Sequence, residues 1–401
     1  MYFSFFKPQD WRKRSVVRGR GFIQRFLNFT GRRENAGPRS VRGSSMNILV
    51  AMSGGVDSSV AAKLLADAGN CCTGCTMKLY TNEDAGIPRG HTCCSLDDVE
   101  DARSVAARLG MRYYVFNFSE DFEEKVIGKF VSSYRHGRTP NPCIDCNRFM
   151  KFDKLFERAR LLGCDHVATG HYARIEEQNG KFILKKALDA SKDQSYVLYT
   201  MTQEQLAHTL FPLGALPKTQ TRAIAEEAGF WNAHKPDSQD ICFVPDGDYA
   251  AAIERLTGER SEPGDFVDRQ GHVLGRHGGI IRYTVGQHRG LGLGQSEKRY
   301  VCALCPEENT VVLGGADELF SRTALVSVMN WISGEAPQTP IRCRVKTRYR
   351  QTEQPAVVTA LPDGWARVDF DEPQRAVTPG QAAVLYDGDV VLGGGTIERA
   401  E

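Results

Sequence analysis

The sequence lacks any apolar run that approaches the roughly 18 residues of a membrane-spanning helix, and it shows no secretory signal. It also lacks a fixed-period repeat and a long low-complexity segment. An excess of one charge is missing too, because the 401 residues carry a net charge of only +2. We therefore expect a globular protein of about two or three domains with no membrane partner, in which any nucleic-acid binding rests on local patches.

Signs of a disulfide framework are also missing, although the chain has twelve cysteines. Without a secretory signal, this usage is typical of reduced thiols that have catalytic or metal-binding roles. We therefore expect a cytoplasmic location.

Acidic residues are rare at the start of the chain, where eleven Lys and Arg face only Asp10 and Glu34 in residues 1–45. Three interpretations of this basic extension compete: an organelle transit segment, a basic arm, or translated sequence upstream of the true start. Met46, immediately before the first expected strand, is a natural initiator. We expect residues 1–45 to be dispensable.

The chain is organised around residues 53–59 (SGGVDSS), a turn between an apolar run and an amphipathic helix. Residues 47–52 predict a short buried strand, and apolar residues recur at helical spacing from Val60 to Ala68. A strand, a glycine turn and a helix N-terminus form an anion site, because the first helical amides lack partners and the helix dipole points the same way. The turn lacks the lysine of a Walker loop, and Asp57 instead suits a magnesium ion beside bound phosphates.

This turn resembles the PP-loop of ATP pyrophosphatases, which cleave ATP to AMP and pyrophosphate to adenylate a carbonyl oxygen. An ordinary tight turn rich in small residues is the alternative. The strand before the turn, the helix after it and the two serines that follow Asp57 favour the ATP site.

Strand-like and helix-like stretches alternate from Met46 to about residue 211. Further strands are predicted at 73–79, at 113–118 and around Val167, and helices are predicted after caps at Ser95 and Ser119 and over 149–162. This alternation predicts an α/β fold with a doubly wound parallel sheet, of the adenine nucleotide alpha hydrolase-like (PP-loop) type, whose ligand lies at the C-terminal strand ends.

The rest of the chain changes in character. Residues 212–275 are rich in helix and loop signals and predict a small central domain or linker. Residues 276–401 contain short strands separated by turn residues, which predict a C-terminal β-barrel.

Two cysteine-bearing stretches stand out. Residues 137–147 (GRTPNPCIDCN) contain two prolines, which predict a rigid exposed loop that ends just before the helix expected near Phe149. A thiol near a helix N-terminus is a better nucleophile, but Cys-x-x-Cys alone is a weak signal because structural zinc has the same spacing. Cys242 lies between apolar residues after a polar loop, so a core role and a functional role stay equally open.

Seven motifs occur in one order: SGGVDSS, GRTPNPCIDCN with Lys151-Phe152, ATGHY (168–172), KDQSY (192–196), KPDSQDICF (235–243), YTVGQH (283–288) and RYR (348–350). Together they resemble the tRNA-specific 2-thiouridylase family from Met46 onward. Members replace the C2 oxygen of uridine 34, the wobble base of certain tRNAs, with sulfur. The resemblance implies a tRNA-uridine 2-sulfurtransferase that uses ATP and Mg²⁺, binds tRNA partly through its central domain, and takes sulfur from a cysteine desulfurase or a sulfur-relay protein.

The resemblance also implies roles for individual residues. It makes Cys146 the nucleophile and Cys242 the carrier of persulfide sulfur. It places ATP at Ala51, Met52, Ser53, Gly54, Gly55, Val56, Asp57, Ser58, Met77 and Gly170. It places the target base beside Asn141, Pro142 and Cys143, and tRNA at His171, Lys192, Asp193, Gln194, Arg348, Tyr349 and Gln381. Some members have Asp where this chain has Cys143, which keeps an iron–sulfur cluster on Cys143, Cys146 and Cys242 as the alternative to a site without metal.

The exchange of oxygen for sulfur at C2 of uracil also follows from ordinary reaction chemistry. The C2 oxygen of uracil is a poor leaving group, and adenylation turns it into AMP, which leaves readily. A persulfide then supplies sulfur, and a second cysteine reduces the S–S bond. The rivals are another PP-loop enzyme, such as a 4-thiouridine synthase-like protein or an amide-forming ligase, and a non-catalytic tRNA-binding protein that senses ATP. A ligase has no use for two loop cysteines.

A basic patch is predicted near the C-terminus. Alternate residues of a strand share one face, so the basic residues at every second position of this stretch would form one stripe: Arg342, Arg344, Lys346, Arg348 and Arg350. Five like charges on one face repel one another, and we predict that they contact phosphates.

Overall fold

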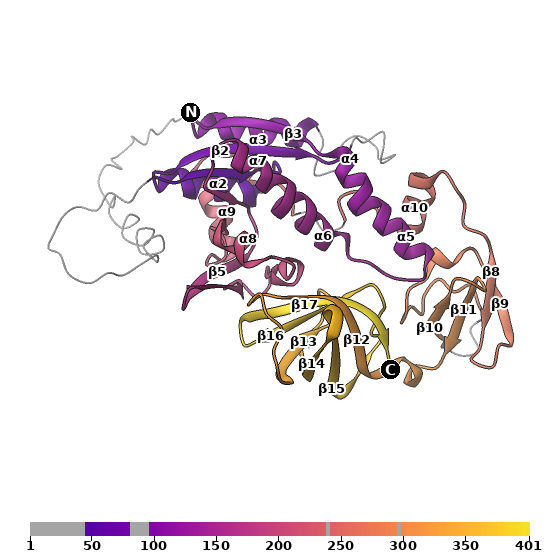
Figure 1. Cartoon of the computed structure of the whole chain (residues 1–401). Coiled ribbons are helices and arrows are strands. Elements are labelled where there is room, and N and C mark those ends of the chain that lie inside the picture. Colours follow the sequence, from indigo (N-terminus) through magenta and orange to yellow (C-terminus); the bar gives the residue numbers. More distant parts are fainter. Residues whose placement is uncertain (1–44, 81–95, 238–240, 295–297) are drawn as a thin grey trace, which may run out of the picture.

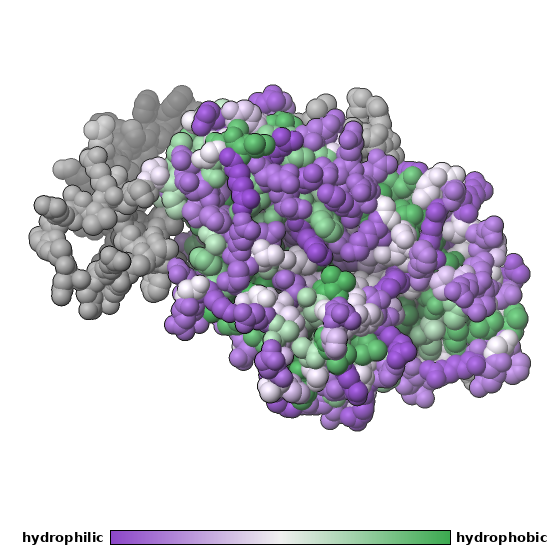
Figure 2. Space-filling model, viewed as in Figure 1, coloured by the Kyte–Doolittle hydropathy of each residue, from purple (hydrophilic) through white to green (hydrophobic). Residues whose placement is uncertain are grey.

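The computed structural model describes residues 45–80, 96–237, 241–294 and 298–401. An α/β part, a small sheet and a barrel follow one another along the chain (Figure 1). Polar side chains cover most of the face shown in Figure 2, with apolar residues in small separate groups. Within the described residues, no helix has the length and apolar character needed to cross a membrane.

A five-stranded parallel sheet forms the α/β part, in the order β3-β2-β1-β4-β7. Its strands are β1 (Asn47–Ala51), β2 (Cys71–Lys78), β3 (Arg112–Asn117), β4 (His166–Ala168) and β7 (Thr209–Leu210). The chain order reverses between β1 and β4, and ligands of such sheets bind at the carboxyl ends of the strands at this point. The predicted doubly wound α/β fold is confirmed.

Helices cover both faces of this sheet. Successive apolar side chains of β1 point to opposite faces and pack against different helices. Ile48 and Val50 belong to one buried cluster with residues of α2 (Val56–Asp67), α3 (Leu96–Arg108) and α9 (Lys218–Glu227). Leu49, between them, packs against α7 (Leu155–Leu161) in another cluster. Because successive side chains of a strand point to opposite faces, α2, α3 and α9 lie on one face of the sheet and α7 lies on the other.

Two long helical segments lie between β3 and β4. The first consists of α4 (Ser119–Phe122), the π-helical η1 (Glu123–Ile127) and α5 (Gly128–Arg135); the second consists of α6 (Pro142–Asp145), the π-helical η2 (Cys146–Lys154) and α7. Ser119 is the first residue of its helix and not the predicted cap. Its amide and hydroxyl donate to Asn117 Oδ1 over 3.1 and 2.6 Å. The cap expected at Ser95 lies outside the described residues.

The second segment corrects a prediction, because it begins at Pro142 and not near Phe149. Proline is tolerated at the first helical position, where its missing amide would have no partner in the helix. The predicted rigid loop over 137–147 is therefore wrong from Pro142 onward. Both cysteines of the Cys-x-x-Cys stretch lie in this helical segment.

Two short helices, η3 (Ser195–Leu198) and α8 (Gln203–Ala207), precede β7. The described residues of 212–257 are helical and loop-rich, as predicted, and contain α9, η4 (Trp231–His234) and α10 (Tyr249–Thr257). A four-stranded sheet in the order β10-β11-β8-β9 follows. Its elements are β8 (Gly264–Val267), β9 (Val273–His277), η5 (Ile280–Arg282), β10 (Tyr300–Cys305) and β11 (Thr310–Gly314). Strand β9 of this sheet contains residue 275, at which the sequence predicts the boundary between the central domain and the C-terminal barrel.

Six strands close the C-terminal β-barrel in the order β12-β15-β14-β13-β16-β17, and β12 also pairs with β17. After η6 (Asp317–Leu319), they are β12 (Phe320–Trp331), β13 (Ile341–Lys346), β14 (Gln354–Leu361), β15 (Trp365–Arg375), β16 (Ala382–Asp387) and β17 (Val390–Ala400), with η7 (Pro362–Gly364) between β14 and β15. The predicted barrel is confirmed, although it begins at Phe320. The hairpin of β5 (Ala173–Gln178) and β6 (Lys181–Lys186) extends this sheet through the pair Val390–Lys185. This pairing ties the barrel to the α/β part.

Candidate nucleotide and sulfur-transfer site

The turn after β1 folds tightly onto the start of α2. Gly54 has a φ of +72°, and a Cβ atom there would lie 2.4 Å from the carbonyl oxygen of Asp98. The Ser53 amide donates to Ser58 Oγ over 3.1 Å, and this hydroxyl donates to the Gly55 carbonyl over 3.1 Å. The N-terminus of α2 is thereby fixed at the carboxyl end of β1, an arrangement that binds phosphate.

A second close approach comes from the segment after β4. A Cβ atom on Gly170 would lie 2.7 Å from the Ser58 nitrogen, so a larger residue would displace the first turn of α2. Met77 lies near the end of β2, the neighbour of β1. The structure therefore brings the predicted ATP residues 51–58, Met77 and Gly170 to one edge of the parallel sheet.

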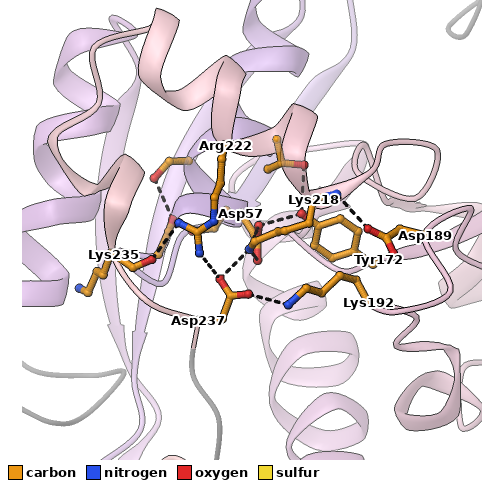
Figure 3. Close-up of polar contacts among 12 residues, drawn as sticks. Asp57, Tyr172, Asp189, Lys192, Lys218, Arg222, Lys235 and Asp237 are labelled. Atoms are coloured by element: carbon orange, nitrogen blue, oxygen red, sulfur yellow. Dashed lines mark hydrogen bonds and ion pairs between the residues drawn. The ribbon is translucent and has the colours of Figure 1, made fainter.

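Both oxygens of Asp57 are bound by a lysine from α9 (Figure 3). Lys218 Nζ lies 2.6 Å from Oδ1 and 2.8 Å from Oδ2 of Asp57, and the Tyr172 hydroxyl donates to Oδ1 over 2.9 Å. Lys218 is only 8% exposed. An ammonium group thus already neutralises the carboxylate, and the expectation that Asp57 holds a magnesium ion does not fit this arrangement.

Lys218 also contacts the segment that precedes Cys242. Its Nζ lies 2.7 Å from Oδ1 of Asp237, which also pairs with Lys192 at 2.9 Å and Arg222 at 3.0 Å (Figure 3). Partial burial alone would raise the pKa of Asp237, but the ammonium groups of Lys218 and Lys192 lower it below its ordinary value. This network was not predicted from the sequence, in which the polar KPDSQD stretch was the available signal.

Cys146 and Cys242 pack against the same buried cluster. The rings of Phe130 and Phe243 meet edge to face in this cluster, with centroids 5.2 Å apart. The Tyr80 hydroxyl donates to the Cys242 carbonyl over 2.7 Å. Two thiols that are far apart in the sequence therefore pack against one apolar cluster. That they meet during turnover stays a prediction.

The start of α6 positions the other predicted target-base residues. Asn141 caps this helix by accepting from the Cys143 amide over 3.1 Å, and Pro142 occupies the first turn. Cys143 is exposed, and Cys146 is half-buried. Among the residues that the structure describes, no three His, Cys, Asp or Glu side chains are grouped so as to hold a metal ion. The three cysteines of the alternative iron–sulfur site are therefore not assembled in this arrangement.

His171, a predicted tRNA contact, is buried at 7% exposure. Its Nδ1 lies 2.6 Å from Thr169 Oγ1 and its Nε2 lies 3.3 Å from Lys151 Nζ. Its ring centroid lies 6.0 Å from that of Phe152 and 5.7 Å from that of Phe211. Burial, and after it the charge of Lys151, lowers the pKa of His171 well below its ordinary value. A neutral ring can accept a hydrogen bond from Lys151 Nζ at Nε2. The contact of His171 with tRNA stays a prediction.

Asp193, Gln194 and Tyr349 form one contact region. Asp193 Oδ1 accepts from the Ser195 amide over 3.2 Å, and Gln194 Oε1 accepts from the Tyr172 amide over 2.9 Å. The Tyr349 hydroxyl donates to the Asp193 carbonyl over 3.2 Å. Burial, followed by the charges of Asp193 and Cys143, raises the pKa of Tyr349. Predicted tRNA residues therefore lie near a predicted target-base residue.

Arg348 and Gln381 connect parts of the molecule. One guanidinium nitrogen of Arg348 donates to the carbonyls of Val285 and Ala376 over 3.1 and 2.9 Å. Gln381 Nε2 donates to the Thr139 carbonyl over 2.7 Å. Both side chains, expected to contact tRNA, thus hold the barrel against the preceding sheet and the segment before α6.

The predicted basic stripe is only partly present, because β13 ends at Lys346. Arg342 and Arg344 are exposed, whereas Arg348 lies beyond the strand and turns inward. Lys346 Nζ lies 5.5 Å from the ring centroid of Tyr386. The prediction of five residues on one strand face is therefore wrong.

Comparison with known proteins agrees with this architecture. Residues 46–246 match the tRNA methyl transferase HUP domain, residues 253–315 the tRNA methyl transferase PRC-barrel domain, and residues 321–397 the aminomethyltransferase beta-barrel domain. The tRNA-specific 2-thiouridylase MnmA of Acetivibrio thermocellus is 50% identical over 359 residues, which are 88% of this chain and 100% of that protein. Its counterpart in Clostridioides difficile is 48% identical over 355 residues, which are 88% of this chain and 98% of that protein.

The fold and the site define an ATP-using PP-loop enzyme with two additional β-rich domains. The chain belongs to the tRNA-specific 2-thiouridylase family, which confirms the resemblance predicted from the motifs. A solved 4-thiouridine synthetase–RNA complex with bound ATP has a TM-score of 0.34 and 17% identity, with 53% of each chain covered. This similarity is too low to support an argument.

Proposed function

We propose that this protein is an ATP-dependent sulfurtransferase that converts uridine 34 of tRNA into 2-thiouridine. The observation that supports the proposal most is the packing of Cys146 and Cys242 against one cluster in a chain with a PP-loop. The named relatives are 2-thiouridylases specific for tRNA. A cytoplasmic location, expected from the cysteine usage, belongs to the same proposal.

The proposed reaction has three steps. The uridine O2 attacks the α-phosphate of ATP, and pyrophosphate leaves. The terminal sulfur of a Cys242 persulfide attacks C2, and AMP leaves. The Cys146 thiolate then attacks Cys242 Sγ, which breaks the S–S bond, leaves the sulfur on C2 and forms a Cys146–Cys242 disulfide. An external thiol reduces this disulfide, and a cysteine desulfurase or a sulfur-relay protein supplies the next sulfur.

The remaining parts of the site have supporting roles in this proposal. The target base lies beside Asn141, Pro142 and Cys143 at the start of α6, and Tyr349 contributes to the same surface. Magnesium would be held by the ATP phosphates and would neutralise part of their charge. Asp57 would not hold it, because this carboxylate is paired with Lys218.

The test is thiolation of a tRNA transcript with ATP, Mg²⁺, a sulfur donor and a thiol, followed by nucleoside mass spectrometry. We expect 2-thiouridine at position 34 and one AMP and one pyrophosphate per sulfur. Cys146→Ser and Cys242→Ser should each abolish thiolation and retain ATP binding. Cys71→Ser, at the exposed start of β2, is the matched control and should stay active. Thiolation by either of the first two variants would contradict the proposal.

A cluster mechanism is the alternative outcome. Without reductant, peptide mapping should find a Cys146–Cys242 disulfide in the wild-type protein after turnover. Stoichiometric iron after anaerobic purification, with no such disulfide, would overturn the proposed steps. Cys143→Ser separates the two mechanisms, because it would destroy a cluster but should only slow the persulfide reaction.

A further inference from the structure

Lys151 has a half-buried side chain whose ammonium group contacts a histidine ring. Its Nζ lies 3.3 Å from Nε2 of His171, and Nδ1 of the same ring lies 2.6 Å from Thr169 Oγ1. With Nδ1 donating to this hydroxyl group, Nε2 is the nitrogen that accepts from the ammonium group. Within the part of the chain that the structure describes, no Asp or Glu forms an ion pair with Lys151. Its positive charge is therefore available to a bound anion.

The segment after β4 places this ammonium group at the nucleotide edge of the parallel sheet. Strand β4 pairs with β1, so His171 follows the neighbour of the strand that leads into the PP-loop. Gly170, before His171, packs against the nitrogen of Ser58. The hydroxyl of Tyr172, after His171, donates to Asp57 Oδ1 over 2.9 Å (Figure 3). The ammonium group thus reaches the edge of the sheet at which phosphates bind.

The backbone of Lys151 belongs to the helical segment of the proposed nucleophile. Cys146 and Lys151 both lie in η2, and a π-helix pairs residues that are five apart. Lys151 therefore lies one turn beyond Cys146, on the helical segment that begins with the proposed target-base residues. π-Helical turns frequently occur at functional sites. A cation is thus held between the turn that would bind ATP and the helix that would meet the base.

The phosphates of a bound ATP have different surroundings in this arrangement. The amides at the start of α2 are suited to the outer phosphates, which leave as pyrophosphate. The α-phosphate has to face the uridine O2, and the proposed base position lies on the side of α6 and η2. Among the three phosphates, the α-phosphate therefore lies towards Lys151.

We propose that Lys151 binds the α-phosphate of ATP and that His171 is a positioning residue for its ammonium group. When the uridine O2 attacks, a P–O bond forms at the α-phosphorus, the bond to the pyrophosphate oxygen breaks, and its electron pair leaves with pyrophosphate. The ammonium group stabilises negative charge on the α-phosphate in this step, and again when the C2–O bond breaks and AMP leaves. The inference rests on the proposed function for these two steps, but its first test needs neither tRNA nor sulfur.

The α-phosphate contact can be measured by comparing AMP with adenosine, which lacks this phosphate. Calorimetric titration of the full chain gives both dissociation constants. We expect the wild type to bind AMP more tightly than adenosine, and Lys151→Met to reduce this preference about tenfold, because a charge-assisted hydrogen bond is lost. Lys151→Arg keeps the charge and should keep most of the preference. Lys154→Met is the matched control, because Lys154 also lies in η2 but pairs with Asp121 at 3.1 Å.

The role of His171 is tested through a double variant. His171→Phe removes the acceptor and keeps a ring in the buried position, so it should reduce the AMP preference by less than Lys151→Met does. The combination of His171→Phe with Lys151→Met should have the same AMP preference as Lys151→Met alone, because His171 acts through Lys151. Additive losses would show that His171 has no positioning role.

A second measurement follows the reaction, as the rate of pyrophosphate release in a single turnover with saturating ATP and tRNA and no sulfur donor. Lys151→Met should slow this step about 100-fold, as the loss of one donor to a developing oxyanion typically does. Lys154→Met should stay near the wild-type rate. Circular dichroism checks that each variant folds, and Lys151→Gln replaces Lys151→Met if the latter does not.

Each outcome has a separate meaning. An unchanged AMP preference in Lys151→Met, or equal affinities for AMP and adenosine in the wild type, would overturn the inference. If the AMP preference is unchanged but the salt slope of tRNA binding is reduced, the anion is a tRNA phosphate and the inference is also wrong. If the wild type makes no 2-thiouridine while Lys151→Met loses the AMP preference, the proposed function fails and the phosphate contact of Lys151 stands.

Discussion

The charge of His171 illustrates what burial does to a single residue. Burial, and after it the nearby Lys151, lowers the His171 pKa well below the ordinary 6.5. As the pH falls below 6.5, the unfolded chain takes up a proton that the folded ring does not. The unfolded state then binds more protons, so this contribution to the free energy of unfolding is complete above pH 6.5 and is lost as the pH falls.

We expect His171→Gln to flatten the pH dependence of stability. The wild-type free energy of unfolding should fall by up to about 1.4 kcal/mol per pH unit more steeply than that of the variant between roughly pH 6.5 and 5. Urea unfolding at several pH values measures this difference. His234→Gln is the matched control, because the His234 side chain is 83% exposed. Equal pH slopes for His171→Gln and the wild type would show that the ring is not kept neutral.

The residues of the nucleotide site differ in how far the sequence predicts them. Gly54 and Gly55 lie in a turn that their own neighbours define, so local sequence is sufficient. Lys218 contacts Asp57 across 161 residues, and neither partner carries a local signal of the other. Local rules describe backbone turns well, but they do not predict which distant charges a fold brings together.

Among the elements, α6 shows that proline does not always predict a loop. The two prolines of residues 137–147 predict a loop because proline lacks an amide donor. Pro142, however, occupies the first turn of α6, where that donor is not needed, and Asn141 supplies the cap. The helical segment therefore begins before both cysteines, and Cys143 and Cys146 are held by helix geometry.

Substitution of Asn141 separates its cap from a contact with the target base. Asn141→Ala should lower the free energy of unfolding by about 1 kcal/mol, because the Cys143 amide loses its acceptor. Asn141→Ser retains an oxygen acceptor and should restore this stability, whereas thiolation should stay low if the amide group touches the base. Thermal unfolding and the thiolation rate are measured on the same samples. Full activity of Asn141→Ser would limit Asn141 to its role as a cap.

Strand pairing between distant segments was also not predicted from the sequence. Residues 173–186 form a hairpin whose strands carry ordinary turn and strand signals, yet it extends the sheet of the barrel through Val390 and Lys185. The ion pair of Arg174 with Asp389 lies at the same junction, at 2.5 Å. Pairing depends on which two chain segments lie side by side in the folded protein, and the spacing of apolar residues within each segment does not predict this.

For the whole molecule, the first question is whether the basic extension is needed. Met46 directly precedes β1, and the described residues from Met46 onward contain the parallel sheet, the four-stranded sheet and the barrel. We expect a protein that starts at Met46 to fold, bind tRNA and thiolate it like the full chain. Circular dichroism, tRNA affinity and the thiolation assay test this. A marked loss of tRNA affinity would show that residues 1–45 contribute to tRNA binding.

The second question concerns which basic residues of the barrel contact tRNA. Arg344 is exposed on β13, so its substitution by Gln should weaken tRNA binding and reduce the slope of log affinity against log salt by about 1. Arg348 donates instead to Val285 and Ala376, at the junction between the barrel and the preceding sheet. Arg348→Gln should therefore lower the free energy of unfolding by about 1–3 kcal/mol and leave the salt slope unchanged.

Both variants are compared with Arg342→Gln. The Arg342 guanidinium group on β13 pairs with Asp371 of β15 at 2.5 Å. Arg344 also has an acidic partner, Glu353, but at the longer distance of 3.9 Å. Because the ion pair of Arg342 is the closer one, the loss of Arg342 should change the salt slope less than the loss of Arg344. Filter binding of tRNA at several salt concentrations and thermal unfolding provide the two readings for each variant. A reduced salt slope with normal stability in Arg348→Gln would show that this guanidinium group leaves the junction to meet a phosphate, and the barrel would then have to move relative to the preceding sheet when tRNA binds.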